Sequence, residues 1–441
     1  MTSRFSRINS FLLLGFLMAL FSGFLFYEGF FDTWQEKIQD RFFLRTQPKD
    51  NIVILSIDDL SISRIGQWPW QRSVFAEALK QLDGAKRIGI DVSFSEPSRF
   101  GKIDDAVLEE ALAKMQAPIV LPIQLSDKGR LTSHPLPIFE RYVHLGFINI
   151  VEDADGVSRR ANAIWGDYRS FASRLTGKES SETFRIRYQG PAGGFLTIPF
   201  IDVFEKQVPG EVFKDAVVLI GTTAKDLRDF EETPFGAMPG VEVHANIAST
   251  LDREKFIKEA SPGLIFALFL LTNLSTAYAI FSLRNFAGLV ISLFGIFTAF
   301  NLATLAAFYF DFLLAPLYLN LNFILTAGLL VALQSIFESK EKNFIRKTFQ
   351  YYLMPEVVDE LMRNPEKLKL GGERKRVTIL FSDIRGFTSM SETMSPEELT
   401  HLVNKYLSAM TEIIIQRRGL VDKYIGDAIM AFWGAPLPNP K

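Results

Sequence analysis

Four hydrophobic stretches decide what this chain can fold into, because each is long enough to cross a lipid bilayer. A membrane-spanning helix needs about 20 mostly apolar residues. The stretches run over residues 11–27, 262–283, 286–308 and 312–333. The chain also has 41 phenylalanines and a mean hydropathy of +0.14, which favours lipid-facing surface over a larger soluble core. We therefore predict four transmembrane helices.

The first stretch has a second interpretation, a cleaved signal peptide, because two arginines precede it. It lacks a clear small-x-small cleavage site, and bulky phenylalanines stand where cleavage would occur. We favour an uncleaved anchor.

The lysines and arginines next to the spans predict their orientation, because such residues concentrate in cytoplasmic segments. The turn between the third and fourth spans carries only Asp311, whereas the other flanks carry Arg4, Arg7, Arg284, Lys340, Lys342, Arg346 and Lys347. This distribution predicts that both termini are cytoplasmic and that residues 28–260 lie outside.

The outer segment alternates strand and helix patterns, which indicates an α/β architecture. Strands are predicted over 51–57, 87–92 and 216–220, and an amphipathic helix over 72–82. Acidic side chains lie at strand ends, at Asp58, Asp59 and Asp91. They are candidate ligand contacts, because ligands bind at the carboxyl ends of parallel strands; capping of helices and turns is the alternative.

Composition excludes several classes of function. With no cysteine, the chain has no disulfides, thiolate metal sites or cysteine nucleophiles, and its four histidines do not fall at zinc-ligand spacings. The net charge of −2 gives no sign of a nucleic-acid partner, which would need a basic patch.

After the fourth span, Phe337, Phe344 and Tyr351 recur every seven residues. This spacing favours a short dimerising signalling helix, with an ordinary amphipathic linker as the alternative. Pro355 and the polar stretch after it then predict an interdomain joint within 334–373.

The last segment reads as strand, helix, strand, tight turn, strand. A strand over 376–381 leads to Asp383, and Ser395 opens a helix with a capping box that Gly419 ends. Strands 420–425 and 428–432 are joined at Gly426-Asp427, a two-residue hairpin turn. If the hairpin pairs beside the first strand, Asp383 and Asp427 converge as hard oxygen ligands for Mg²⁺ or Mn²⁺.

The outer segment resembles the type-two CHASE domain, an extracytoplasmic sensor found ahead of bacterial cyclases and kinases. The motifs that carry this resemblance are SIDDLSISRIGQWPW (56–70), GIDVSFSEP (89–97), GFINIVEDADGVSRR (146–160) and two motifs within 218–247. The resemblance implies a multi-pass protein of the bacterial inner membrane that responds to an unknown outside signal.

The last segment resembles class III adenylate and guanylate cyclases through FSDIRGFT (381–388) and VDKYIGDAIMAFWG (421–434). The resemblance implies that Asp383, Asp427 and the Ile384 carbonyl bind two Mg²⁺ or Mn²⁺ ions. It also implies that Gly386, Phe387 and Thr388 cradle the phosphates and that Lys423 contacts the purine. A lysine donates to adenine N1, which favours ATP over GTP.

In that family, an asparagine that positions the ribose and an arginine that stabilises the transferred phosphate lie in the second half of the domain. The sequence stops at Lys441, before that half. We therefore expect a truncated catalytic domain that is inactive alone. Three functions remain open: a receptor-type adenylate cyclase acting as a homodimer, a guanylate cyclase, and a non-catalytic membrane sensor.

The predicted fold class combines an α/β sensor domain, four transmembrane helices and the N-terminal half of an α+β (ferredoxin-like) cyclase domain. The predicted boundaries are 1–10 (cytoplasmic N-terminus), 11–27 (first span), 28–260 (sensor), 262–283, 286–308 and 312–333 (further spans), 334–373 (signalling helix and linker) and 374–441 (catalytic segment).

Overall fold

The computed structural model describes residues 2–43, 51–283, 285–350 and 374–435. The chain divides into two compact units, Met1–Leu330 and Val331–Lys441. Because residues 351–373 and position 284 lie outside the described residues, so do the predicted joint, Tyr351 and Arg284.

Four of the described helices are long and apolar enough to cross a membrane, which confirms the predicted number of spans. They are α1 (Thr2–Tyr27), α10 (Pro262–Ser282), α11 (Phe286–Tyr309) and α12 (Pro316–Gln350). The predicted start of the fourth span is wrong, because Phe312–Leu313 forms strand β16 and the helix begins at Pro316. The helix also continues past residue 333, because no proline or glycine interrupts residues 329–350.

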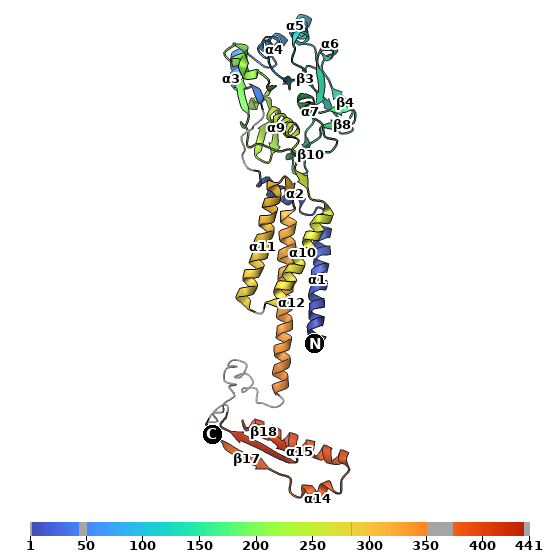
Figure 1. Ribbon diagram of the computed structural model, residues 1–441, viewed down its shortest axis with the longest axis vertical. Coiled ribbons are helices and arrows are strands. Elements are labelled where there is room, and N and C mark those ends of the chain that lie inside the picture. Colours follow the sequence, from blue (N-terminus) through green and yellow to red (C-terminus); the bar gives the residue numbers. More distant parts are fainter. Residues whose placement is uncertain (1, 44–50, 284, 351–373, 436–441) are drawn as a thin grey trace. The chain divides into compact units, whose positions relative to one another are not determined.

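Buried amides join the membrane helices. α1 and α10 run side by side (Figure 1). The Asn273 side chain on α10 donates to the Gly15 carbonyl of α1 at 2.9 Å, and it exchanges hydrogen bonds with Asn322 of α12. Interhelical hydrogen bonds of this kind hold helices together in lipid, where apolar surfaces alone provide no hydrophobic driving force.

The sensor domain is built on a seven-stranded sheet in the order β11-β1-β12-β2-β3-β4, with β5 paired to β3. Pairing is parallel except between β3 and β4. The strands are β1 (Ile52–Ile57), β2 (Arg87–Ile90), β3 (Ile119–Leu125), β4 (Leu131–Ser133), β5 (His144–Phe147), β11 (Leu196–Pro199) and β12 (Val217–Thr222). The predicted strands and the predicted α/β class of this segment are confirmed.

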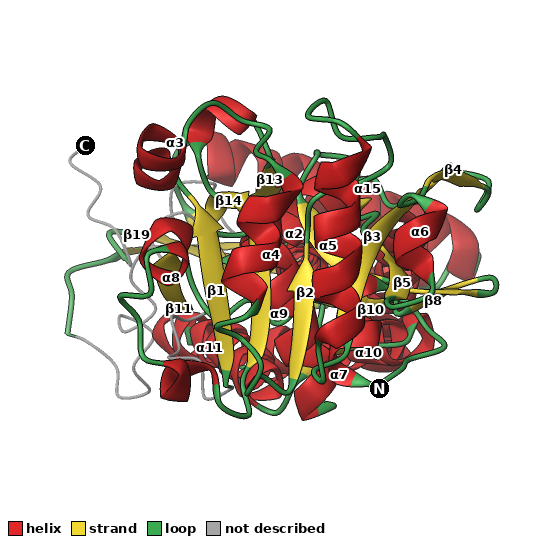
Figure 2. Cartoon of the chain, turned by 90° about the horizontal axis from the view of Figure 1, so that it is seen from above, coloured by secondary structure: helices red, strands yellow, loops and turns green. Residues whose placement is uncertain are grey.

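Helices cover both faces of this sheet, so its central strands are buried on both sides. Along β1, Leu55 and Ile57 face one core whereas Ile52 and Ile54 face the other. Figure 2 shows α4 and α5 lying over one face. Helices α3 (Asp59–Ile65), α4 (Arg72–Leu79), α5 (Lys102–Lys114), α6 (Pro137–Glu140) and α8 (Phe200–Phe204) belong to the first side, and α7 (Phe171–Thr176) and α9 (Gly240–Arg253) to the second.

Small sheets and one short helix complete the sensor domain. The helix α2 (Asp32–Asp40) follows α1, and β15 (Lys258–Glu259) pairs in parallel with β16, which lies between α11 and α12. The remaining strands are β6 (Val151–Glu152), β7 (Ser158–Ala161), β8 (Ile164–Trp165), β9 (Tyr168–Arg169), β10 (Phe184–Arg185), β13 (Phe230–Thr233) and β14 (Gly236–Pro239).

A buried ionic network joins α2 to these small sheets. The Arg159 side chain, which is 1% exposed, donates to the carboxylates of Asp40, Asp153 and Asp155 at 2.7–3.0 Å. Arg160 binds both Glu36 on α2 and Glu259 on β15. The network thereby ties the sensor domain to the helix that follows the first span.

The second unit contains a three-stranded antiparallel sheet in the order β17-β19-β18, packed against one long helix. Its elements are β17 (Thr378–Ser382), α14 (Phe387–Ser391), α15 (Pro396–Gln416), β18 (Leu420–Ile425) and β19 (Ala428–Trp433). The predicted capping box is present: the Ser395 hydroxyl accepts from the Glu398 amide, and the Glu398 side chain accepts from Ser395.

The end of α15 differs from the prediction. Arg418, with φ of 61°, is the left-handed residue, and Gly419 follows it. Gly419 is required for space instead, because a Cβ there would lie 2.6 Å from the Trp433 ring. The Trp433 indole also donates to the Arg417 carbonyl at 2.8 Å, which fixes the helix end against β19.

Candidate active site

Two aspartates meet at one edge of the small sheet. Asp383 follows β17 directly, and Asp427 occupies the turn between β18 and β19, where Gly426 has φ of +66°. Because β17 pairs with β19 in the register Ser382↔Ile429, the end of β17 lies beside that turn. The convergence predicted from the sequence is confirmed.

The Ile384 amide ties the two carboxylates together. It lies 3.0 Å from Asp383 Oδ1 and 3.3 Å from Asp427 Oδ2. A hydrogen bond to Asp427, together with burial and the negative charge of that neighbour, raises the pKa of Asp383 above its ordinary value. Two carboxylates held this close repel each other when both are ionised, and a bound cation relieves that repulsion.

The donor set suits a hard divalent cation. Carboxylate and carbonyl oxygens are the ligands that Mg²⁺ and Mn²⁺ prefer, and these ions keep several waters or substrate oxygens in their shell. Within residues 2–43, 51–283, 285–350 and 374–435, no three acidic or histidine side chains are grouped to hold a metal alone. The pair is therefore an open site that needs oxygens from a substrate or water.

The predicted phosphate loop lies directly beside this pair. Gly386 has φ of +74° and precedes the short helix α14, which begins at Phe387 and includes Thr388. The Phe387 amide donates to the Ile384 carbonyl at 3.2 Å, so this carbonyl already accepts one hydrogen bond and keeps one lone pair.

Lys423, the predicted purine contact, lies on β18, on the far side of β19 from β17. Its ammonium group pairs with Asp422 at 3.2 Å, and the Lys423 side chain is 59% exposed. The structure therefore brings Asp383, Ile384 and Asp427 together and leaves Lys423 apart from them.

The acidic residues singled out in the sensor domain separate into two groups. Asp58 caps α3 by accepting from the Ser61 amide at 2.8 Å, and Asp59 is exposed in the first turn of that helix. Asp91 instead lines a pocket of about 280 Å³. Its carboxylate also lies 4.0 Å from the ring of His244, which is not among the lining residues. The position of Asp58 is therefore explained by helix capping, whereas Asp91 lies in a pocket.

Sequence reasoning missed contacts made by side chains distant in the chain. Tyr406 on α15 bonds the Ser382 hydroxyl at 2.9 Å, beside Asp383. Asp229 and Thr222 share the pocket of Asp91. The tyrosine lies on the helix predicted between Ser395 and Gly419, whereas nothing in the local pattern distinguishes Asp229.

Two family profiles match the chain. The CHASE2 domain matches residues 12–282, and the adenylate and guanylate cyclase catalytic domain matches residues 372–441. Both predicted resemblances are therefore confirmed. The first match covers more than half of the chain, including the first two of the four spans.

Curated proteins are similar to part of this chain. The chain is 51% identical over 69 residues to an adenylate cyclase of Anabaena cylindrica, covering 15% of this chain and 14% of that protein. A 97-residue stretch is 32% identical to adenylate cyclase 1 of Rhizobium meliloti, covering 21% of this chain and 14% of that protein. The chain thus spans about one seventh of these relatives.

Solved structures are also similar to part of the chain. The adenylyl cyclase CyaB from P. aeruginosa is 46% identical over 16% of this chain and 36% of that chain, with a TM-score of 0.16. The guanylyl cyclase Cya2 is 42% identical over the same shares, with a TM-score of 0.15.

Proposed function

The chain belongs to the CHASE2-domain family and carries a segment of the class III cyclase catalytic domain, and we propose from this premise that it is a receptor-type adenylate cyclase. In this proposal the sensor domain controls conversion of ATP to cyclic AMP and pyrophosphate. The observation that carries it is the meeting of Asp383 and Asp427 beside a glycine-containing loop.

Each residue of the site has a proposed role. Asp383, Asp427 and the Ile384 carbonyl hold two Mg²⁺ or Mn²⁺ ions. Bound ions supply Lewis-acid activation of the ribose 3′-hydroxyl and neutralise the triphosphate. Backbone amides around Gly386, Phe387 and Thr388 receive phosphate oxygens, because amides that point into one concavity bind anions. The two carboxylates thereby set where the phosphates lie.

The direct test measures cyclic nucleotide in membranes that contain the protein, with Mn²⁺ and either ATP or GTP. The 441-residue chain is compared with a version extended by the residues that follow the matched region in the Anabaena cylindrica enzyme. Cyclic AMP from the extended version supports the proposal. Absence of product from both, with the protein folded, favours a non-catalytic membrane sensor.

In the extended version, replacing Lys423 with glutamate should shift the nucleotide preference from ATP towards GTP. The lysine donates to adenine N1, whereas guanine carries a hydrogen at that position and needs an acceptor. We expect the kcat/KM value for ATP divided by that for GTP to fall about tenfold or more. A change of this size corresponds to the loss of one hydrogen bond from a charged group. Lys405→Glu, an exposed lysine on α15, is the matched control. A wild-type protein that already prefers GTP contradicts the assignment.

We further propose a homodimer. On the sheet face turned away from α15, Ile379 is 52% exposed and Phe381 is 65% exposed. On α12, Phe344 is 72% exposed, at one of the sevenfold positions. Apolar surface of this kind is commonly covered by a partner in soluble regions. A second copy would cover both surfaces.

We propose that the membrane is the bacterial inner membrane and that both termini are cytoplasmic. The absence of cysteine allows a clean test, because one introduced thiol is the only target of a maleimide. A membrane-impermeant maleimide should label Lys128→Cys, in an exposed sensor turn, in intact spheroplasts. Lys342→Cys, exposed on α12, should be labelled only after permeabilisation. The reverse pattern contradicts the proposed orientation.

A further inference from the structure

The pocket that contains Asp91 lies where the chain leaves the central sheet in opposite directions. β2 continues to α5 on one face, and the chain after β12 reaches α9 on the other face. Because β2 and β12 are adjacent and parallel, a crevice opens at their carboxyl ends. Open α/β sheets bind ligands at such switch points.

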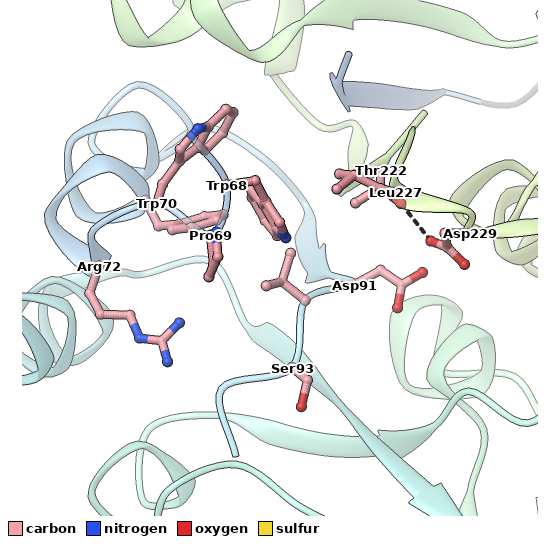
Figure 3. A pocket seen from close by; sticks show the side chains of 11 residues that line it. Trp68, Pro69, Trp70, Arg72, Asp91, Ser93, Thr222, Leu227 and Asp229 are labelled. Carbon is pink, nitrogen blue, oxygen red and sulfur yellow. Dashed lines mark hydrogen bonds between the residues drawn. The ribbon is translucent and has the colours of Figure 1, made fainter. Parts of the chain in front are cut away.

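One wall of the pocket is aromatic and the other is acidic. Trp68, Trp70 and Phe75 form the aromatic side, with Pro69 beside them, and Trp68 and Trp70 pack edge to face at 5.2 Å. Figure 3 shows the carboxylate of Asp91 pointing towards Asp229 across the pocket. The Thr222 hydroxyl donates to Asp229 at 2.7 Å. This combination fits a cation with an apolar body.

Asp91 is a buried acid without a hydrogen-bond partner among the described residues. Its side chain is 8% exposed and it lines the pocket. The neighbouring His244 ring is 5% exposed, and its Nδ1 also has no partner in the described part of the chain. A buried carboxylate that lacks a partner costs free energy, so the native fold retains here a group that an incoming ligand can satisfy.

The third charged group of the pocket is already engaged. Arg72 lies 3.5 Å from Asp105, donates to the Glu96 carbonyl at 3.1 Å and stacks over Phe94 at 4.3 Å. Its charge is therefore balanced within the protein. The remaining charge in the pocket comes from two aspartates, which disfavours an anionic ligand.

We propose that this pocket binds a small organic ammonium ion, with its charged nitrogen between Asp91 and Asp229 and its apolar part against Trp68 and Trp70. A divalent metal fits less well, because Ca²⁺ takes six to eight oxygens and the pocket offers two acidic side chains and much aromatic surface. The role of this ligand as the outside signal rests on the proposed receptor function.

Binding should depend on pH through Asp91. Burial, and then the charge of Asp229, raise the pKa of Asp91 to about 7. Burial lowers the pKa of His244 to about 4, so the histidine is neutral. Arg72, paired with Asp105, stays charged throughout this range of pH. A cation binds the ionised form of Asp91, and the dissociation constant should fall about tenfold from pH 6 to pH 8.

The test measures binding directly on the full chain in detergent, so it needs neither cyclase activity nor a membrane orientation. Quenching of tryptophan fluorescence is followed with benzylamine, its neutral analogue benzyl alcohol, its anionic analogue benzoate, tetramethylammonium and CaCl₂. We expect saturable binding of the ammonium compounds alone. Asp91→Asn should weaken it at least about tenfold, whereas Asp59→Asn, an exposed aspartate outside the pocket, should leave it unchanged.

Trp68→Leu separates a binding defect from a folding defect, because it leaves both carboxylates in place. It should weaken the ammonium compounds severalfold and leave thermal unfolding of the sensor domain close to wild type. Equal binding of benzylamine, benzyl alcohol and benzoate overturns the proposal. So does saturable binding of Ca²⁺ alone, or no ammonium-selective response from a panel of ten primary and quaternary amines.

Discussion

In the version extended with residues of the Anabaena cylindrica enzyme, replacing Asp383 and Asp427 together by asparagine should remove Mn²⁺ binding. It should also reduce cyclic nucleotide formation by at least about 100-fold, the loss that follows removal of preorganised charge. Asparagine keeps the size of each side chain and removes its charge. The expected loss comes from the two carboxylates that meet at Ile384. Manganese binding is measured by the electron paramagnetic resonance signal of free Mn²⁺, which needs no turnover.

Stability separates this effect from misfolding. The pKa of Asp383 is raised by its carboxylate neighbour, so the folded state holds a proton there more tightly than the unfolded chain does. Stability linked to that proton is present below the ordinary pKa and is lost as pH rises through the raised value. At neutral pH the double variant should therefore unfold no earlier than wild type. Glu412→Gln, an exposed acid on α15, is the control for Mn²⁺ binding. Unchanged binding in the double variant would sink the metal site.

The sequence was sufficient to predict features set by local pattern. Each of the four spans is one apolar run, so its existence follows from residues next to one another. The meeting of Asp383 and Asp427 also follows, because a two-residue turn and a strand end leave little freedom in the register. Even here, the start of α12 at Pro316 was not predicted. Phe312 and Leu313, which were predicted to be helical, instead form a strand that pairs with β15.

Features that depend on distant pairing were not predictable. The strand order places β12 between β1 and β2, although more than 120 residues separate it from either. That insertion brings Asp229 to Asp91 and creates the pocket. Local pattern identified Asp58 and Asp91 as candidates in the same way, and it left both capping and ligand contact open for them. Only the tertiary structure separates the two.

Arg159 is the clearest case of such distant pairing, because it joins Asp40, 119 residues away, to two aspartates beside it on the sensor domain. The Arg159 side chain is 1% exposed, and replacement by methionine would keep most of its volume. It would leave Asp40 and Asp155 without their cation, whereas Asp153 would keep its pair with Arg160. Removing one partner of a buried ionic network costs about 3–5 kcal/mol. The stability of Arg159→Lys should lie between those of wild type and Arg159→Met. Lysine keeps the positive charge, but its ammonium group cannot make the bidentate contacts of a guanidinium.

Thermal unfolding of the purified protein, followed by tryptophan fluorescence, measures the effect, which should be a fall in Tm of about 10 °C for a domain of this size. Arg169→Met is the matched control, because Arg169 and Glu179 form an exposed pair that should contribute about 0–1 kcal/mol.

The hydrogen bond from Arg159 also lowers the pKa of Asp155. That part of the stability is present above the ordinary aspartate pKa and is lost as pH falls through the lowered value. The gap between wild type and Arg159→Met should therefore be widest near neutral pH and narrow below about pH 4. An Arg159→Met variant as stable as Arg169→Met at pH 7 would show that this network does not hold the sensor domain to α2.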